Sequence, residues 1–358
     1  MGKHDWYRLL TLNQTDQPPM ATLYVIEQGA EIGCDGERIE VRRGADIIGS
    51  VPLVKLDDIV IFGNVGISTP AMKRLLDRGI EVTFMTVDGR YQGRLIGQVT
   101  AHVALRHAQY ACAADPARAL ALAQRFVEGK LRNQRALLQR FSRNRAEPPP
   151  EAQAAADDLE AYIKRVKRTT QLSSLLGVEG SATARYFAGL RSLIGPEWSF
   201  SGRQRRPPPD PVNLLLSLGY TLLAHKVLGA VQAAGFDPYL GFLHSLDYGR
   251  PSLALDIMEE FRPILIDSLV VRICNDGRIR PEHFRPGEGE RPIIITDEGK
   301  RAFLTAFEER MRTEATHPEG ADSGPGKVPY TRCIALQARR LARVVRQRTD
   351  DYEPFAVR

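Results

Sequence analysis

The sequence predicts an α+β protein in which a small N-terminal β-domain precedes a larger, all-helical domain. Short segments with strand-like patterning fill the chain from Thr22 to about Gly97, whereas apolar residues recur at three- and four-residue spacing after His102. A chain of 358 residues with 43% hydrophobic content can bury two cores. The expected organisation is an N-terminal extension over residues 1–20, a β-domain over residues 21–98 and a helical domain over residues 99–358.

The β-domain is predicted from five segments rich in strand-forming residues: TLYVIE, ERIEVRR, DIVIF, IEVTFM and RYQGRLIG. Asp35-Gly36 and Asp88-Gly89 are typical of hairpin turns, because glycine readily adopts the positive φ that these turns require. The segments are therefore expected to pair through tight turns in one small domain.

One helix is expected to interrupt these strands. Ser68 suits an N-cap, Pro70 suits the first helical turn, and Gly79 provides a stop after AMKRLLDR. The residues before Met20 end in two prolines, which separate them from the first strand pattern. They are therefore expected to be either an appendage to the β-domain or an overcalled start.

The helical domain is predicted from long segments with helical periodicity, beginning with VALRHAQYACAA, ARALALAQRFVEGKLRNQRALLQRF and AQAAADDLEAYIKRV. Stretches rich in proline, glycine and polar residues break this pattern at residues 144–151, 201–212 and 317–327, which are predicted loops. Residues 291–307 are expected to form a strand, an Asp-Glu-Gly turn and a further helix.

The composition favours a soluble, cytoplasmic protein with an anionic partner. No run approaches the ~18 apolar residues of a membrane span, and the N-terminus lacks the pattern of a signal peptide. A net charge of +6 favours a partner such as nucleic acid without establishing one. The four cysteines are far apart and are expected to be free thiols: Cys34, Cys112, Cys274 and Cys333.

The stretch GFLHSLDYGRPSLALDIMEEFRP combines a loop histidine with three acids on a predicted helix. From a helix start near Ser252, the spacing of Asp256, Glu259 and Glu260 brings their carboxylates to neighbouring positions. An ordinary amphipathic helix with a solvated acidic face is the simpler explanation of the acids alone. His244 adds a different chemistry, because an imidazole that converges with carboxylates suits a hard divalent cation.

Another acid, Glu179, stands between Gly177 and Gly180 at the expected start of a helix. In that position its charge would complement the helix dipole, which is the simpler interpretation. The glycines also allow a ligand or another backbone to approach closely. Both interpretations stay open from these residues alone.

The loop FSGRQRRPPPDPVN carries Arg203, Arg205 and Arg206 beside a stiff run of prolines. Such a run would hold guanidinium groups at a fixed reach for phosphate oxygens. These arginines are therefore candidates for DNA binding, and a solvated linker is the alternative.

Three segments in this order carry a resemblance to a known family: GVEGSATARYFAGL, RRPPPDPVNLLLSLGYTLL and GFLHSLDYGRPSLALDIMEEFRPILIDSLV. Together with the N-terminal TLYVIEQGAEIGCDGERIEVRR, the chain from Thr22 to about Arg348 resembles the CRISPR-associated protein 1 family. That family is the integrase of CRISPR adaptation. The resemblance implies a β-sandwich-like N-terminal domain through which two copies dimerise, and a helical catalytic domain.

The resemblance also implies the residues of the active site. A glutamate, a histidine and an acidic residue bind a divalent metal in the family, and these catalytic roles fall on Glu179, His244 and Glu259. Many relatives have aspartate at the third position, and the neighbouring Glu260 leaves open which carboxylate is the ligand. Three residues are assigned to the surroundings of the metal: Asp256, Glu260 and Asn213.

The implied activity is that of a DNA integrase and endonuclease that depends on Mg²⁺ or Mn²⁺. The 3′-hydroxyl of a short foreign DNA duplex attacks a phosphodiester at the boundary of the CRISPR repeat, which is transesterification. The implied partners are double-stranded DNA and a central dimer of CRISPR-associated protein 2, flanked by two dimers of this chain. Without a cysteine cluster of its own, the chain leaves any CRISPR-associated protein 4 activity to a separate partner.

Two other functions remain compatible with the residues. A metal-dependent nuclease of branched DNA in repair would use the same ligands with water as the nucleophile. A non-catalytic nucleic-acid scaffold would carry the acids only as a solvated face, and its activities would be insensitive to EDTA.

Overall fold

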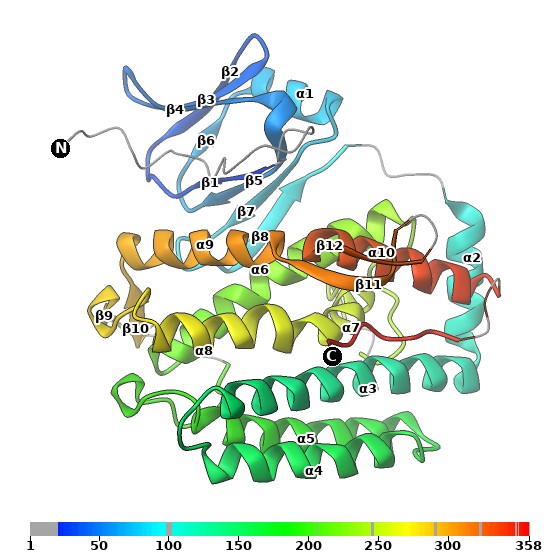
Figure 1. The fold of residues 1–358 in the computed structure, drawn as a ribbon. Helices are drawn as coiled ribbons and strands as arrows, with labels where there is room; N and C mark the ends of the chain where they lie inside the picture. The colour runs from blue at the N-terminus through cyan, green and yellow to red at the C-terminus, as the bar shows by residue number, and fades with distance from the viewer. Residues whose placement is uncertain are drawn as a thin grey trace. The chain divides into compact units, whose positions relative to one another are not determined.

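The computed structural model divides the chain into two compact units, Met1–Val99 and Thr100–Arg358 (Figure 1). It describes residues 21–97, 102–205, 207–244, 247–289, 292–321, 324–347, 349 and 351–357. The expected extension over residues 1–20 and the expected boundary at residues 98 and 99 lie outside the described residues. The two units are therefore treated one at a time.

The first unit contains eight strands and one helix among its described residues. In chain order these are β1 (Ala21–Val25), β2 (Glu31–Asp35), β3 (Arg38–Arg43), β4 (Asp46–Pro52), β5 (Leu56–Phe62), β6 (Gly66–Ile67), α1 (Thr69–Asp77), β7 (Glu81–Met85) and β8 (Tyr91–Leu95).

These strands form two four-stranded sheets, in the orders β1-β5-β7-β8 and β4-β3-β2-β6. In the first sheet β1 and β7 run parallel to β5, and β8 is antiparallel to β7. In the second sheet β2, β3 and β4 form an antiparallel meander. One hydrophobic core includes buried side chains from both sheets, such as Ile32, Ile39, Ile59 and Val82. The predicted β-domain is therefore present, with two sheets around a shared core.

The local signals of this unit are confirmed in the structure. The Ser68 side chain accepts a hydrogen bond from the Ala71 N–H at the start of α1, and Pro70 lies in the first helical turn. Gly79, Gly36 and Gly89 all have positive φ, at the helix end and at the two predicted turns. The short or weakly patterned strands β2, β4 and β6 were not among the five predicted segments.

The second unit is mainly helical, as the sequence predicts. Its helices are α2 (Val103–Ala114), α3 (Pro116–Arg143), α4 (Pro150–Val166), α5 (Leu172–Arg191), α6 (Pro211–Ala233), α7 (Ser252–Phe261), α8 (Ser268–Asn275), α9 (Asp297–Arg312) and α10 (Tyr330–Val345). Short 3₁₀ turns lie at Pro196–Trp198 and Pro281–His283, and a third lies at Leu53–Lys55 in the first unit.

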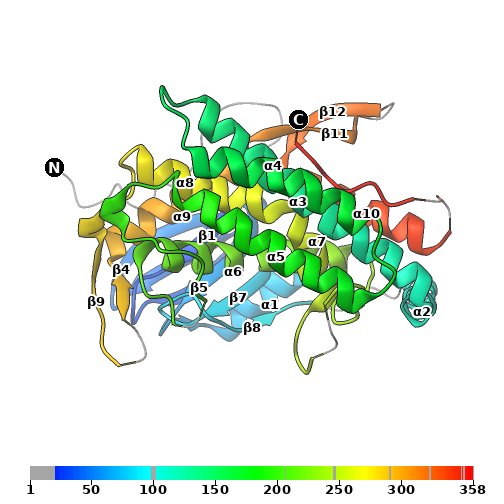
Figure 2. The same ribbon diagram turned by 90° about the horizontal axis from the view of Figure 1, so that it is seen from below.

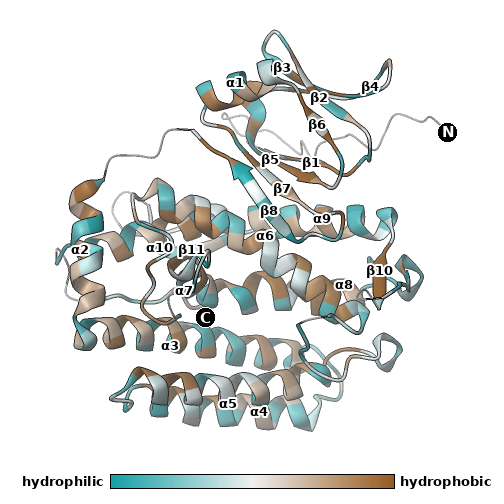
Figure 3. Cartoon of the chain, turned by 180° about the vertical axis from the view of Figure 1, so that it is seen from behind, coloured by the Kyte–Doolittle hydropathy of each residue, from teal (hydrophilic) through white to brown (hydrophobic). Residues whose placement is uncertain are grey.

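Helices α3, α4 and α5 pack together, each against the other two, as Figure 1 and Figure 2 show from two sides. Apolar and polar residues alternate along these three helices, as Figure 3 shows, because each has a buried and an exposed face. α3 also contacts α7, which lies in turn against α6. This packing brings residues from α3, α5 and α7 into one region.

Helix α6 is the one described helix long and apolar enough to cross a membrane by length and composition. Half of its most apolar window is buried, and it contacts α7 and α10. A core helix passes the same test of length and composition, and α6 packs as such a helix does.

The second unit is mostly helical but not all-helical, because it also contains two short hairpins, one of which includes the strand predicted within residues 291–307. β9 (Phe284–Pro286) pairs with β10 (Ile293–Ile295), and β11 (Glu314–Ala321) pairs with β12 (Gly324–Pro329). The predicted loop at residues 317–327 is thus mostly a hairpin, because backbone pairing organises a segment whose glycines and prolines suggest a loop. The predicted Asp-Glu-Gly turn is the first turn of α9, capped by Thr296.

A π-helical segment, Arg262–Asp267, joins α7 to α8. Pro263 lies in this segment and cannot donate a backbone hydrogen bond, which disfavours regular α-helical pairing there. π-helical turns are rare and occur frequently at functional sites. This one places Arg262 and Asp267 beside the residues described next.

Candidate metal centre

The acids of α7 are buried rather than solvated. Asp256 and Glu260 are fully inaccessible and Glu259 is 2% exposed, because α3 and α6 cover the helix. The interpretation of these acids as an ordinary solvated face is therefore wrong. Buried carboxylates require partners, and the partners of each acid show what it does.

Asp256 holds the loop that carries His244. Its Oδ2 accepts the backbone N–H groups of Phe242 at 2.6 Å and Leu243 at 3.0 Å, and its Oδ1 accepts that of His244 at 3.0 Å. Gly241 is needed next to this carboxylate, because a Cβ there would lie 2.7 Å from Asp256 Oδ2. The loop conformation therefore depends on one buried carboxylate.

The same carboxylate orients the imidazole of His244. His244 Nδ1 lies 2.6 Å from Asp256 Oδ1, and Nε2 lies 3.8 Å from Glu259 Oε1. Donation from Nδ1–H to Asp256 leaves the lone pair on Nε2, directed toward Glu259. The structure thus brings His244 together with Asp256 and Glu259.

Glu179 lies within α5 and not at its start. The helix begins at Leu172, two turns earlier than predicted, so the interpretation of Glu179 as a first-turn partner of the helix dipole is wrong. Its Oε1 accepts a hydrogen bond from Thr183 Oγ1 at 2.9 Å. A Cβ at Gly177 or Gly180 would meet no atom within 4 Å among the described residues, so this face of α5 is open.

Lys130 of α3 joins the two glutamates and was missed by sequence reasoning. Its ammonium is in contact with Glu179 Oε1 and lies 2.8 Å from Glu259 Oε2, while the residue is only 4% exposed. Burial opposes the charge, but Glu259 and Glu179 outweigh it and raise the pKa of Lys130. The sequence does contain a signal for this residue. Lys130 stands four residues after Phe126 and seven before Leu137, a helical spacing that puts it on the buried side of α3.

Arg262 provides a second cation at Glu259, with Nη1 2.9 Å from Oε1. Burial would raise the pKa of the Glu259 carboxyl, but Arg262, Lys130 and His244 outweigh it and lower the pKa to about 2. Glu259 is therefore a buried anion near neutral pH. It is held by cationic side chains from α3 and from the π-helical segment.

Two carboxylates and an imidazole are a donor set that Mg²⁺ and Mn²⁺ accept. Among the described residues, no three His, Cys, Asp or Glu side chains are gathered closely enough to hold a metal as they stand. The ammonium of Lys130 lies between the glutamates of α5 and α7 instead. The pair of Glu179 and Glu259 already accommodates one cation, so the charge and the donor types here suit a divalent ion.

Glu260 is turned away from this cluster. Adjacent residues of a helix point in directions about 100° apart, and the Glu260 carboxylate accepts from Tyr352 Oη, Gln337 Nε2 and the Phe355 N–H instead. These contacts therefore do not support the assignment of Glu260 to the surroundings of the metal. Of the two neighbouring glutamates, Glu259 is the one positioned beside His244.

The hydrogen bonds of Asn213 run to the arginine-bearing loop and the start of α6. Its amide accepts from Arg203 Nη1 at 2.9 Å and from the Gln204 N–H at 2.8 Å, and it donates to Asp210 and the Gly202 carbonyl. Asn213 thus shapes the arginine-bearing loop. The described arginines, Arg203 and Arg205, line a pocket that also contains Lys130, whereas Arg206 lies outside the described residues.

A family model described as CRISPR associated protein Cas1 matches residues 23–309. A CRISPR-associated endonuclease Cas1 of Rhodospirillum rubrum is 37% identical over 344 residues, covering 93% of this chain and 97% of that protein. A Thermus thermophilus endonuclease Cas1 is 36% identical, with 95% and 98% covered. This chain belongs to the Cas1 family, as the resemblance of its motifs implies.

Three further comparisons extend this result. A Cas4 exonuclease/Cas1 endonuclease fusion of Geobacter sulfurreducens is 34% identical over 94% of this chain and 60% of the fusion. A casposase bound to integration product superposes with a TM-score of 0.83 at 22% identity over 95% of each chain, which shows a shared fold. A chain of a Cas6-RT-Cas1–Cas2 complex gives a TM-score of 0.80 at 26% identity, covering 96% of this chain and 37% of that one.

Proposed function

We propose that this protein is a divalent-metal-dependent DNA integrase and endonuclease of CRISPR adaptation. In this proposal it joins the 3′-hydroxyl ends of short foreign DNA to the CRISPR repeat by transesterification. The single observation that carries the proposal is that buried Lys130 bridges Glu179 and Glu259, while His244 Nε2 lies 3.8 Å from Glu259 Oε1. Its membership of a family whose curated relatives are named endonucleases supports it.

The residues of the chain have separate tasks in this proposal. Glu179, Glu259 and His244 Nε2 hold Mg²⁺ or Mn²⁺, and Asp256 keeps the imidazole in the tautomer that exposes the Nε2 lone pair. The ion, when bound, would lower the pKa of the attacking hydroxyl and offset charge on the reacting phosphate. Arg203 and Arg205 hold neighbouring phosphates, while Lys130 and Arg262 bring positive charge to the reaction site.

The reaction is balanced without a further co-reactant. A new P–O bond forms to the attacking 3′-oxygen, the P–O bond to the displaced repeat strand breaks, and the hydroxyl proton passes through solvent or a side chain to the leaving oxygen. One phosphodiester replaces another. His244, whose Nε2 lies 3.8 Å from Glu259 Oε1, can act both as a ligand and as a proton carrier.

The partners in this proposal are double-stranded DNA and Cas2. Similarity to a chain of a Cas1–Cas2 complex supports Cas2, and a relative fused to Cas4 supports Cas4 as a separate partner here. We propose dimerisation through the β-domain and two such dimers for each integration complex. The net charge of +6 suits the DNA.

The deciding experiment is a strand-joining assay at saturating protein, with DNA ends that carry a 3′-hydroxyl or a 3′-deoxy terminus. A longer joined strand should form only with the 3′-hydroxyl and only with metal, and Glu179→Ala should abolish it while duplex binding persists. Joining by Glu179→Ala at saturation would overturn the proposal.

Two outcomes would instead support the alternatives. Metal-dependent cleavage that does not require the 3′-hydroxyl would support a nuclease of branched DNA. This is the second candidate, because the relatives are named endonucleases. Complete insensitivity to EDTA would support a scaffold. The burial of Asp256 and Glu259 already contradicts the premise that these acids form a solvated face.

A further inference from the structure

The C-terminal segment (residues 352–357) forms neither a helix nor a strand, yet its two aromatic side chains are buried. Tyr352 is 1% exposed, and its ring packs on Phe126 of α3 with the ring centres 5.2 Å apart. Phe355 is 3% exposed and stacks on Phe261 of α7 with the ring centres 5.4 Å apart. The segment therefore packs against two helices of the candidate metal centre.

Side chains of α3 and α7 satisfy the polar groups of this segment. Glu260 of α7 accepts the Phe355 N–H at 2.7 Å and the Tyr352 hydroxyl at 2.6 Å. Asn133 of α3 donates to the Phe355 carbonyl at 2.8 Å and accepts the Val357 N–H at 2.9 Å. A buried segment without a backbone ladder of its own needs such partners. Its conformation therefore depends on both helices.

Asn133 joins the segment and the two helices at one point. The side chain is fully buried, and the Nδ2 group that binds the Phe355 carbonyl also donates to the Glu260 carbonyl at 2.7 Å. One amide of α3 thus holds a backbone group of α7 and a backbone group of the segment. The placement of α3 against α7 here involves the segment as well as the helices themselves.

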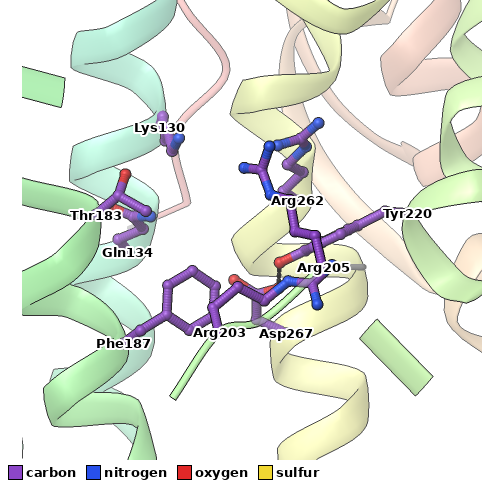
Figure 4. Close-up of a pocket in the computed structure, with 9 residues that line it drawn as sticks. All are labelled: Lys130, Gln134, Thr183, Phe187, Arg203, Arg205, Tyr220, Arg262 and Asp267. Carbon is purple, nitrogen blue, oxygen red and sulfur yellow. Dashed lines mark hydrogen bonds between the residues drawn. The ribbon is translucent and has the colours of Figure 1, made fainter. Parts of the chain in front are cut away.

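The residues that hold the segment are close in sequence to the candidate metal centre. Glu260 follows Glu259 on α7, and Asn133 lies one helical turn after Lys130 on α3. The Lys130 ammonium lies 2.8 Å from Glu259 Oε2. Lys130 and Arg262 line one pocket, and Figure 4 shows them on facing helical segments. A shift of α3 against α7 would therefore change the contact between Lys130 and Glu259.

Gly129, the residue before Lys130, lets the segment approach α3 closely. A Cβ at this position would lie 2.6 Å from Pro354 Cβ and 3.2 Å from Glu260 Cγ. Glycine inside a helix is less stable than alanine. The close approach of Pro354 is thus kept at a cost to α3, and it occurs directly beside Lys130.

We propose that the C-terminal segment is a positioning element of the candidate metal centre. It sets the separation of α3 and α7, and thereby the placement of Lys130 relative to Glu259. The segment acts through the two helices and is not a ligand. Its effect on a bound divalent ion rests on the proposed function, whereas its effect on these two side chains does not.

The first test removes residues 350–358 and measures Mn²⁺ affinity by calorimetry. The shortened chain should bind Mn²⁺ at least about 10-fold more weakly, the effect of disturbing what holds a metal ligand in place. A synthetic peptide of residues 350–358, added in excess, should restore the affinity. The same peptide with Tyr352→Ala and Phe355→Ala should not. A folded shortened chain that binds Mn²⁺ as tightly as the full chain would overturn the proposal, because the segment would then only stabilise the fold.

Gly129→Ala tests the same idea in the full chain, so it does not require the shortened chain to fold. Alanine favours the helix, while its Cβ displaces Pro354. Mn²⁺ affinity should fall. Gly177→Ala is the matched control, since it makes the same change within α5 where a Cβ would meet no atom within 4 Å among the described residues. It should leave Mn²⁺ affinity unchanged, and equal affinities in the two variants would contradict the proposal.

Combining the two changes shows whether the alanine acts through the segment. In the chain that lacks residues 350–358, Gly129→Ala should cause little further loss of Mn²⁺ affinity, because the group that it displaces is absent. A full additional loss would mean that the new Cβ acts on Glu260 directly, and positioning by the segment would be wrong.

A last arm in EDTA separates this proposal from the proposed function. Lys130→Met should lower the melting temperature of the full chain more than that of the shortened chain, because the contact between Lys130 and Glu259 is held less well without the segment. If the full chain bound no Mn²⁺, the proposed function would fail, and these melting temperatures would still decide the role of the segment. Equal losses in the two chains would overturn it.

Discussion

Glu259 and Glu260 are adjacent in sequence and equally buried, yet their surroundings differ in kind. Glu259 faces the cations Lys130 and Arg262, which lower the pKa of its carboxyl to about 2 against the effect of burial. Glu260 faces Tyr352 and the backbone N–H of Phe355, and burial raises the pKa of its carboxyl to about 7.

The difference shows that burial does not decide what a carboxylate does. Neutral donors stabilise Glu260 too little to offset its desolvation, so it acts as an acceptor that fastens the C-terminal residues to α7. Full charges keep Glu259 ionised, and an ionised carboxylate is what a divalent ion needs. One face of α7 therefore serves the candidate metal centre, and the other holds the fold together.

The largest expected effect is on strand joining, and it appears when glutamine replaces each of the two glutamates in a separate variant. Glu259→Gln should reduce metal-dependent strand joining to background, because an amide brings no negative charge to the metal. Glu260→Gln should retain joining within about tenfold of wild type, less than the loss expected for an outer partner of a metal, because its contacts are with Tyr352, Gln337 and Phe355. A joining assay with Mn²⁺ and a duplex-binding titration measure both.

Both variants should bind duplex DNA normally, since phosphate contacts by Lys and Arg dominate that affinity. If Glu260→Gln abolished joining and Glu259→Gln did not, the assignment of the two faces would be reversed.

The sequence predicts the fold class and several local features of this protein, because these depend on neighbouring residues. Strand alternation, helical periodicity and the cap at Ser68 all act within a few positions. The choice between Glu259 and Glu260 could not be made in that way. Their partners Lys130 and Tyr352 are far away in sequence, and only the packing of α3 and of the C-terminal residues brings them to α7.

The start of α5 was misplaced for a related reason. Glycines at 177 and 180 suggest a helix boundary, but tertiary packing of Leu175 and Val178 extends the helix back to Leu172. The hairpin at β11 and β12 was missed because its strands contain the glycines and prolines that usually mark loops. In both cases long-range contacts outweighed local preference.

A second prediction concerns the cation on the Glu259 side. Lys130→Met should lower the free energy of unfolding of the metal-free protein by about 3–5 kcal/mol, because it leaves Glu179 and Glu259 without their shared counterion. Added Mn²⁺ should restore much of that loss, since binding to the folded state stabilises it by mass action. Denaturant titrations with EDTA or with Mn²⁺ provide the measurement.

Lys167→Met is the matched control for this change. Lys167 Nζ lies 3.2 Å from the buried Glu128, but the side chain is 53% exposed and Arg125 and Arg132 remain as partners. Its removal should cost less than about 1 kcal/mol. A loss in Lys130→Met that was the same in EDTA and in Mn²⁺ would show that Lys130 does not compete with the metal.

A third prediction concerns pH and the Glu260 side. The folded state keeps a proton on Glu260 up to about pH 7, whereas the unfolded state releases it near the usual value of 4.5. The folded state therefore binds more protons over this interval, and stability falls as pH rises from 4.5 to 7. The loss is about 3 kcal/mol in all, from about 1.4 kcal/mol per unit of pKa shift.

Glu260→Gln should remove this part of the pH dependence. The free energy of unfolding of wild type minus that of the variant, measured in EDTA from pH 4.5 to 8, should decline and then level off above pH 7. Glu259 behaves in the opposite sense, because its lowered pKa contributes stability above pH 4.5 that is lost as pH falls toward 2. A difference between wild type and Glu260→Gln that stayed constant with pH would contradict the contrast between the two faces.

The smallest effect is expected from Asp256, which supports the Glu259 side without touching that glutamate. Both of its oxygens accept hydrogen bonds, from the backbone N–H groups of residues 242–244 and from His244 Nδ1. Asp256→Asn replaces one acceptor by an NH₂ group, so either the loop or the imidazole loses its partner. Mn²⁺ affinity should fall by about 10- to 100-fold, the usual effect of removing an outer partner of a histidine ligand.

Saturating Mn²⁺ should then restore joining in Asp256→Asn, which distinguishes a positioning residue from a ligand. Asp276→Asn makes the same chemical change at an exposed carboxylate that accepts hydrogen bonds from Arg278, and it should leave Mn²⁺ affinity unchanged. Calorimetric titration of Mn²⁺ into each protein gives the affinities. If excess Mn²⁺ left Asp256→Asn inactive, Asp256 would have to act on the metal or the substrate directly, and the orientation of His244 through Nδ1 would not explain its position.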